Sequence, residues 1–187
     1  MIAYLKGEIV EIEGNEIILN VNDIGFAINT AHIKTLQVGK TYTFYIYEHI
    51  KEDEYSLYGF LDKNELRLFK LIVEHIQGVG PKTAMNIFRT LSFEEIKKAI
   101  EEKDYRPFLE VKGLGEKTAK RIVLEIGGEL FREEEEDKVK EVYQALINLG
   151  FEKDSVKNAL KSLDKNLTVE ELIKEGLKKL SNEKYKA

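Results

Sequence analysis

Cysteine is absent from the 187-residue chain, and histidine occurs only three times, as His32, His49 and His75. Without cysteine there can be neither a disulfide framework nor a thiolate metal site, and the composition fits a reducing cytoplasm. The three histidines lie in different segments and lack the spacing of metal ligands. No arrangement of nucleophile and base can be argued either. We therefore expect no catalytic residue, no metal site and no cofactor.

A long apolar run is also missing. The first eight residues already contain Lys6 and Glu8, so the N-terminus resembles neither a signal peptide nor a transmembrane span, and we expect no membrane association. Hydrophobic residues nevertheless make up 43% of the chain and aromatic residues 10%. This is enough apolar material for folded cores and is not typical of a disordered chain.

The chain has no overall excess of positive charge, since its net charge is −5. Charge is unevenly distributed, however: residues 1–62 carry −6, residues 63–131 carry +2 and residues 132–187 carry −1. A surface that binds phosphates is therefore expected in the middle third, as a local patch and not as a field over the whole protein.

Residues 1–62 have the pattern of a small β-barrel. Short runs rich in β-branched and aromatic residues are separated by turn signals at Gly14-Asn15, Asn22-Asp23 and Gly39-Lys40. About five strands in 60 residues, with no helix long enough for a βαβ unit, indicate an OB-fold. An SH3-like barrel would give a similar pattern.

The hydrophobic period changes to that of helices at Asp62, which with Glu65 resembles a capping box. Residues 63–131 are predicted to form short helices joined by glycine-containing turns, and Ser92 with Glu95 opens one of these helices. Residues 132–138 contain no apolar residue and indicate an acidic linker or the exposed start of a helix. Residues 139–187 predict a three-helix bundle whose first helix ends at Gly150, so the fold class is multi-domain α+β.

Internal duplication is the strongest feature. Residues 76–84 read IQGVGPKTA, and residues 111–119, which lie 35 positions later, read VKGLGEKTA. Both copies have the form apolar-x-Gly-apolar-Gly-x-Lys-Thr-Ala, and both open a helical pattern. This is the pattern of a tandem helix-hairpin-helix DNA-binding domain.

The residue types explain how such a hairpin would bind DNA. Two glycines allow a sharp turn and a close approach to a phosphate, and the unpaired N–H groups of the following helix face that phosphate. The apolar residue between the glycines, Val79 or Leu114, is expected to point inward and to anchor the hairpin between its helices. None of these groups reads a base, so binding should be independent of sequence and sensitive to salt. The candidate DNA-binding residues are Gly78, Val79, Gly80, Lys82, Thr83, Gly113, Leu114, Gly115, Lys117, Thr118, Lys120 and Arg121.

Other interpretations account for parts of this repeat. The first copy superficially resembles a P-loop, but Pro81 and Glu116 stand where that motif needs glycine, so ATP hydrolysis is not expected. The glycines could simply end helices, although two matching copies argue against this. Lys120 and Arg121 fit a solvated helix face equally well.

In its order of domains the whole chain resembles the RuvA family, whose members bind Holliday junctions. The residues that carry the resemblance are the opening MIAYLKG, Tyr58-Gly59-Phe60 at the end of the barrel, and the two hairpins. The resemblance implies a homotetramer that holds a four-way junction open, with two tetramers forming an octamer on DNA. It also implies roles in recombination and repair.

The same resemblance assigns roles outside the hairpins. Glu52 and Asp53 match the acidic pin at the centre of the junction, where carboxylates would repel phosphates; otherwise they fit an ordinary hairpin tip. The C-terminal bundle, in which Leu149-Gly150-Phe151 looks like the loop of a ubiquitin-associated domain, would bind the RuvB ATPase. The RuvC resolvase is a further implied partner. Candidate contacts to the motor, which fit the bundle's core equally well, are Leu160, Leu163 and Leu172.

One residue departs from the family pattern, and two alternative functions also fit the sequence. Many family members have two consecutive lysines where this chain has Glu116-Lys117, so the second hairpin is expected to bind more weakly. The chain could instead be an accessory module of a repair nuclease whose barrel stacks single strands on Tyr42, Phe44 and Tyr45. In a third reading it is mainly a protein-interaction adaptor, and changing Lys82 and Lys117 would then leave its function intact.

Overall fold

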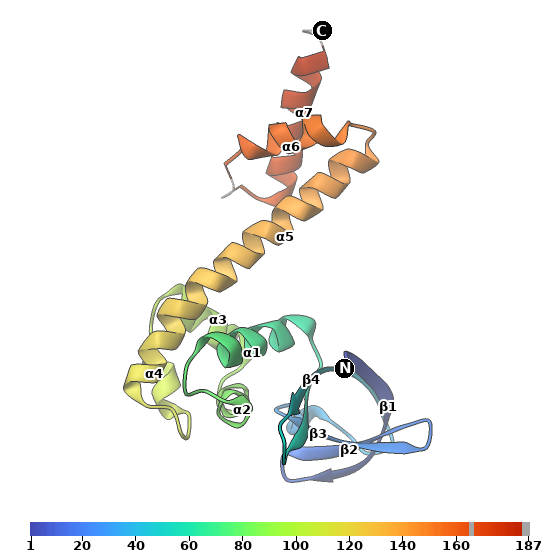
Figure 1. The fold of residues 1–187 in the computed structure, drawn as a ribbon, viewed down its shortest axis with the longest axis vertical. Coiled ribbons are helices and arrows are strands. Elements are labelled where there is room, and N and C mark those ends of the chain that lie inside the picture. The colour runs from blue at the N-terminus through green and yellow to red at the C-terminus, as the bar shows by residue number, and fades with distance from the viewer. Residues whose placement is uncertain (165–166, 185–187) are drawn as a thin grey trace. The chain divides into compact units, whose positions relative to one another are not determined.

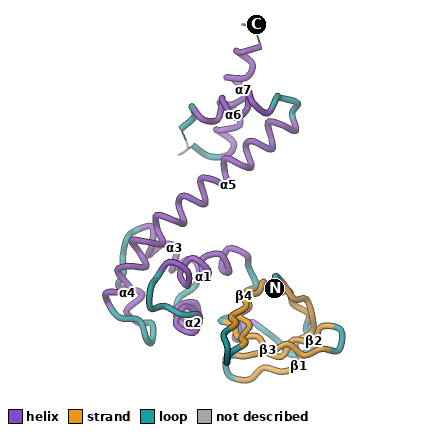
Figure 2. The backbone as a smooth tube through the Cα atoms, viewed as in Figure 1, coloured by secondary structure: helices purple, strands orange, loops and turns teal. Residues whose placement is uncertain are grey.

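The computed structural model describes residues 1–164 and 167–184, without the side chains of residues 131–135 and 182–184. The chain forms two compact units, Met1–Glu129 and Leu130–Ala187. The first unit contains all the strands described, followed by helices, and the second is helical (Figures 1 and 2). The β-rich and helical segments predicted for residues 1–62 and 63–131 therefore belong to one unit.

Five strands close into a barrel in the order β1-β2-β3-β5-β4, with β4 paired to β1. They are β1 (Tyr4–Glu13), β2 (Glu16–Val21), β3 (Ile24–Thr30), β4 (Thr41–Ile50) and β5 (Tyr55–Phe60). Strands β3 and β5 run parallel, and every other neighbouring pair is antiparallel. A short 3-10 helix, η1 (Ile33–Thr35), follows β3. The prediction of an OB-like barrel is confirmed.

Turn residues predicted from the sequence make the first two hairpins of this barrel. Gly14 adopts a φ of 58° between β1 and β2, and Asn22 and Asp23 adopt φ values of 50° and 64° between β2 and β3. Two consecutive residues with positive φ form the tight turn whose twist matches that of the flanking strands. The local sequence therefore sets the register of β1, β2 and β3.

Alternate residues of the strands fill the barrel. The buried core consists of Ile9, Ile17, Leu19, Ile28, Leu36, Phe44, Ile46 and Leu57. At Gly59 a Cβ atom would lie 2.5 Å from Ile28 Cγ2, so the barrel closes tightly only with glycine at this position. Packing inside the barrel therefore explains the glycine in the middle of the Tyr58-Gly59-Phe60 segment.

Helices follow the barrel without a long connection. They are α1 (Lys63–His75), α2 (Pro81–Thr90), α3 (Phe93–Glu101), the 3-10 helix η2 (Arg106–Glu110) and α4 (Glu116–Arg121). Helix α4 continues through a π-helical segment, η3 (Ile122–Ile126), into α5 (Gly127–Asn148). Ser92 and Glu95 form a complete capping box at the start of α3, as predicted.

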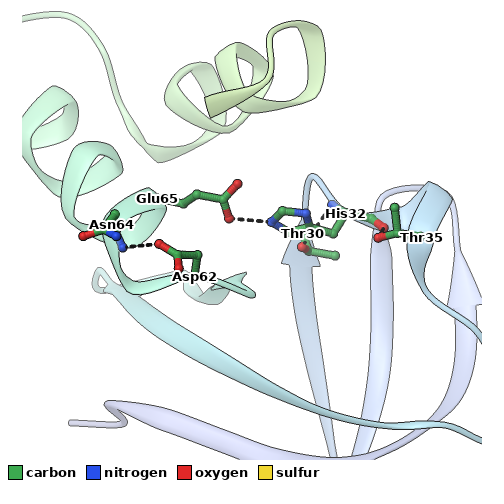
Figure 3. A network of polar contacts seen from close by, with 6 residues as sticks. All are labelled: Thr30, His32, Thr35, Asp62, Asn64 and Glu65. Carbon is green, nitrogen blue, oxygen red and sulfur yellow. Dashed lines mark hydrogen bonds and ion pairs between the residues drawn. The ribbon is translucent and has the colours of Figure 1, made fainter. Parts of the chain in front are cut away.

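The start of α1 differs from the predicted capping box. Asp62 is the N-cap and accepts a hydrogen bond from the amide of Asn64 at 2.6 Å. Glu65 does not complete a box: its carboxylate contacts Nε2 of His32 at 2.7 Å instead (Figure 3). Because His32 follows β3, this partly buried contact ties the barrel to the first helix.

Aromatic packing makes the larger connection between barrel and helices. Phe60 of β5 lies 4.9 Å from Phe69 of α1 and 5.4 Å from Phe88 of α2, measured between ring centroids. Tyr47 of β4 meets Phe69 edge-on at 5.3 Å. Such contacts bury large apolar surfaces in preferred geometry, so the barrel and the first two helices pack around one aromatic cluster.

The second unit is a small helical bundle. The later part of α5 packs with α6 (Lys153–Lys161) and α7 (Val169–Lys184) around Val142, Leu146, Val156, Ala159, Leu160, Leu172 and Leu180. Gly150, with a φ of 90°, ends α5 as predicted: its amide donates to the carbonyl of Ile147, and the amide of Phe151 donates to that of Leu146. Thr168 and Glu171 cap α7 reciprocally.

Residues 132–138, for which a linker or the exposed start of a helix was expected, lie inside α5. The backbone there is helical, and the two units divide at Glu129 and Leu130 instead of within this acidic stretch. Seven consecutive residues without an apolar side chain do not prevent a helix, since Glu, Lys and Arg are good helix formers.

Candidate nucleic-acid interface

The first hairpin joins α1 to α2 through residues 76–80. The amide of Val79 donates to the carbonyl of Ile76 at 3.1 Å, and the amide of Ala84 donates to that of Gly80 at 2.9 Å. Gly78 has a φ of 88°, a left-handed conformation that favours glycine. The chain therefore reverses direction in five residues, with Gly80 as the N-cap of α2.

The second hairpin repeats this geometry. The amide of Leu114 donates to the carbonyl of Val111 at 3.1 Å, that of Ala119 donates to Gly115 at 2.9 Å, and Gly113 has a φ of 87°. The element before the turn differs, since a five-residue 3-10 helix replaces the long α1. Two segments 35 residues apart thus form the same turn, as the sequence repeat predicts.

The apolar residue between the glycines points inward in both copies. Val79 and Leu114 keep only 4% and 8% of their surface exposed, and Ala84 and Ala119 are fully buried. These side chains anchor each turn between its helices. The expected inward anchor is therefore present in both hairpins.

The second glycine of each copy leaves the helix start open. Gly80 and Gly115 are N-caps without a side-chain cap, and a Cβ atom at either would meet nothing within 4 Å among the described residues. The first N–H groups of a helix have no partner within it and carry its positive dipole end. Both turns can therefore donate backbone hydrogen bonds to a phosphate that approaches closely.

Lys82, the cation of the first hairpin, is already paired. Its Nζ lies 3.0 Å from a carboxylate oxygen of Glu54, which precedes β5 in the barrel. The hydrogen bond to Glu54 raises the pKa of Lys82, and the same bond, helped by Ser56, lowers the pKa of Glu54. The Lys82 side chain remains 77% exposed, so a phosphate could compete with Glu54 for it.

The cations of the second hairpin are paired within their own helical segment. Lys120 lies 2.6 Å from Glu116 and 4.8 Å from the ring centroid of Tyr105. Arg121 donates from Nε and Nη2 to the carboxylate of Glu125 at 2.7 and 3.1 Å. Both residues were uncertain between phosphate contact and a solvated helix face, and in the structure each already has an acidic partner.

Lys117 differs from these cations. Its side chain is exposed and has no ion pair in the part of the chain that the structure describes. Thr118 beside it is half-buried, as is Thr83 in the first copy. Lys117 is therefore available to a phosphate, in contrast to Lys120 and Arg121.

The two hairpins touch each other through their side chains. Asn86 Nδ2 donates to the carbonyl of Lys112, and Arg121 Nη1 donates to the carbonyl of Gln77, each at 3.4 Å. The two turns therefore lie next to each other, and the exposed residues predicted to bind DNA form a single candidate surface around them, whereas Val79 and Leu114 lie beneath it.

The predicted pin residues, Glu52 and Asp53, are exposed in the connection between β4 and β5. The amide of Lys51 donates to the carbonyl of Glu54 at 2.7 Å, which closes this connection into a tight loop. Glu54 belongs to the same acidic run but was not among the residues predicted to have a role. Nothing in the local pattern indicates that its partner is Lys82, 28 residues later.

The aromatic residues proposed to stack single strands do not form an exposed row. Phe44 is fully buried in the barrel core, and Tyr42 packs against that core. Tyr45 is half-buried, with Nζ of Lys63 5.3 Å from its ring centroid. Tyr42 and Phe44 therefore pack in or against the barrel core, which is the usual role of such residues.

The three candidate motor contacts lie in the bundle. Leu160 and Leu172 are part of its buried core, and Leu163 packs against it. Their placement accounts for their apolar character without a partner. A role in binding the motor stays a prediction.

Nothing in the described ranges suggests a metal centre, since no three His, Cys, Asp or Glu side chains gather there in a suitable group. Among the helices described, none is long and apolar enough to cross a membrane. His49 stacks on Tyr47 at 6.5 Å, His32 contacts Glu65, and His75 ends α1, so each histidine has a structural place.

Comparison with known families covers nearly the whole chain. Residues 1–59 match the RuvA N terminal domain, residues 70–127 match a SAM-like helix-hairpin-helix tandem, and residues 137–181 match the RuvA C-terminal domain. These matches follow the same order as the barrel, the hairpins and the bundle.

Individual proteins are similar over their full length. The Holliday junction branch migration complex subunit RuvA of Nautilia profundicola is 40% identical over 184 residues, which cover 98% of this chain and 99% of that protein. The proteins of the same name from Phytoplasma mali and Clostridium botulinum (strain 657) are 34% and 33% identical, covering 97% and 96% of this chain and 98% and 99% of theirs. The resemblance inferred from the sequence is confirmed.

Proposed function

The chain belongs to the RuvA family, and from this premise we propose that it binds four-way Holliday junction DNA and acts in branch migration. It does so as a DNA-binding subunit without a catalytic site of its own. The relatives are named as subunits of a complex, which agrees with this role.

One observation supports the proposal above all others. Two copies of the same turn lie next to each other, and each presents an open helix start to a phosphate. Such contacts position a protein on the DNA backbone and carry no information about base sequence. The proposed ligand is therefore recognised by the arrangement of its phosphates, which is what distinguishes a junction from a linear duplex of equal sequence.

In this proposal several copies of the chain assemble to recognise the shape of the junction. We expect a homotetramer that presents eight hairpins to four arms, and an octamer when a second tetramer covers the other face. Glu52 and Asp53 of each subunit would lie at the crossover, where exposed carboxylates repel phosphates and keep the strands apart. Repetition of a weak, sequence-independent grip around a symmetric assembly supplies the specificity that one hairpin lacks.

The second unit is proposed to recruit the motor. A separate helical bundle with its own core can bind a partner without disturbing the DNA-binding unit. The partner would be the RuvB ATPase, with the RuvC resolvase acting on the same junction, in the cytoplasm.

Competition binding tests the proposal. The full-length protein is mixed with a labelled four-way junction and challenged with an unlabelled junction or with linear duplexes of the same total sequence. We expect the unlabelled junction to compete at much lower concentration than the duplexes at about 0.1–0.2 M salt, where non-specific binding is weakened. Equal competition by both would refute junction binding, and size measurement with and without the junction would test the tetramer.

A further inference from the structure

The residues that connect the two hairpins are spaced by 35 positions, like the hairpins themselves. Asn86 and Arg121 are 35 residues apart, as are the residues whose carbonyls they contact, Gln77 and Lys112. The donor of each helix therefore reaches the turn of the other hairpin. Two contacts related in this way form a reciprocal pair across the duplicated unit.

We propose that Asn86 and Arg121 are positioning residues that hold the two phosphate-binding turns at a fixed separation. The inference rests on the proposed function, because the separation matters only if both turns grip DNA together. Neither residue needs to touch DNA for this role. Each acts through the turn of the opposite hairpin.

The contacted carbonyls lie where they can control the turn. Gln77 and Lys112 each precede the glycine with positive φ, Gly78 and Gly113. A donor on that carbonyl fixes the peptide plane that leads into the glycine. The orientation of the following N–H groups, which would meet the phosphate, depends on this plane.

Each donor is itself oriented by a neighbour on its own helical segment. Arg89 Nη1 donates to Oδ1 of Asn86 at 3.2 Å, so the amide nitrogen of Asn86 is the atom left to face Lys112. Arg121 is held by its two hydrogen bonds to Glu125. Side chains fixed in this way lose little additional freedom when they hold the opposite turn.

A fixed separation has an energetic consequence for binding. Two turns that move independently must be ordered when both contact one duplex, and that ordering weakens binding. Two turns already tied together avoid this cost. The reciprocal contacts therefore help both hairpins to engage at the same time.

Amide hydrogen exchange in the DNA-free protein tests the reciprocity directly. In Asn86→Ala we expect the amide of Leu114 to exchange about fivefold faster, while that of Val79 is unchanged; Arg121→Met should give the reverse. Both amides hydrogen-bond within their own turns, so their exchange reports turn opening. Thr90→Val is the matched control, because the Thr90 hydroxyl donates to the backbone carbonyl of Asn86 within α2 and reaches neither turn among the described residues. Equal changes at both turns in each variant, or no change, would overturn the proposal.

Junction binding supplies the second readout. Asn86 is uncharged, so Asn86→Ala itself removes no cation. It can lower the salt dependence of binding only if the displaced turn loses a lysine–phosphate contact, each of which contributes about 0.9 to the slope of log K against log salt. We expect a lower slope for Asn86→Ala and an unchanged slope for Thr90→Val. A wild-type slope in Asn86→Ala would overturn the positioning role. Failure of the wild-type protein to prefer junctions would instead refute the proposed function.

Discussion

The two hairpins have the same backbone but different electrostatic surroundings. Their glycines differ by one degree in φ, and their turns close with hydrogen bonds of equal length. The cation of the first hairpin is neutralised by Glu54 from the barrel, whereas Lys120 in the second is neutralised by Glu116 of the same helix and Lys117 is left exposed. Backbone geometry has been kept in both copies, while the charges around it have diverged.

This difference indicates which part of the grip is essential. Backbone N–H groups at an open helix start serve as donors whatever the nearby side chains, so the turns must be alike. The charges set how strongly each turn attracts a phosphate against its own acidic neighbours. We therefore expect the two hairpins to be equivalent in structure and unequal in their response to changes of charge.

Charge reversal should have the largest effect. Lys82→Glu combined with Lys117→Glu places a carboxylate beside both open helix starts, and we expect junction affinity to fall about 100-fold or more at 0.1 M salt, with the fold unchanged. Both side chains are exposed, so circular dichroism should match wild type, and loss of the Lys82–Glu54 pair should lower the thermal unfolding midpoint only slightly. Unchanged function in the double variant would support the reading as a protein-interaction adaptor. Each single variant then shows which hairpin contributes more.

Substitution of the left-handed glycines tests the structural equivalence. Gly78→Ala and Gly113→Ala force alanine to a φ near +88°, which costs about 1–2 kcal/mol in either turn. Chemical denaturation should show similar losses of unfolding free energy in the two variants, because no atom of the described residues lies within 4 Å of the new Cβ atom. A clear inequality would mean that the turns are supported differently, for example by the long α1 before only the first of them.

Local features of this molecule could be predicted from sequence because neighbouring residues determine them. Turns at Gly14 and Asn22-Asp23, the capping box at Ser92 and the helix end at Gly150 depend on a few adjacent residues. The repeated hairpin was predicted for the same reason, with its inward anchors.

Side-chain partners distant in sequence could not be predicted in this way. Glu65 has the spacing of a capping box, yet it contacts His32, 33 residues earlier, because folding brings η1 beside α1. Glu54 and Asn86 likewise find partners 28 and 26 residues away. The π-helical segment at 122–126 has no pattern in the sequence that distinguishes it from a regular helix. These features depend on tertiary packing, which periodicity does not encode.

Removal of the acidic partners should strengthen binding moderately. Glu54→Gln frees Lys82 and Glu116→Gln frees Lys120, so we expect each to raise junction affinity about threefold and to steepen its salt dependence. The two sites are distinct, so the effects should multiply in the double variant. Glu102→Gln, which removes the same charge from the i,i+4 pair of Lys98 with the C-cap residue of α3, is the control for a general change in net charge. If the control strengthens binding equally, the pairing at the hairpins has no specific effect.

Loss of the contact between Tyr105 and Lys120 should have the smallest effect on junction affinity. The contact is another difference between the hairpins, because no aromatic ring of the described residues lies over Lys82. Tyr105→Leu keeps an apolar side chain but removes the ring 4.8 Å from Nζ of Lys120, together with the hydroxyl that hydrogen-bonds to Glu116 and Lys120. Lys120 remains held by Glu116, so junction affinity should change by less than about twofold. In a Glu116→Gln background the ring would be the remaining restraint, and the same change should then have a larger effect. Titration of the labelled junction with wild type, the two single variants and the double variant measures the coupling energy between Tyr105 and Glu116. Equal effects of Tyr105→Leu in both backgrounds would show that the two side chains act on Lys120 independently.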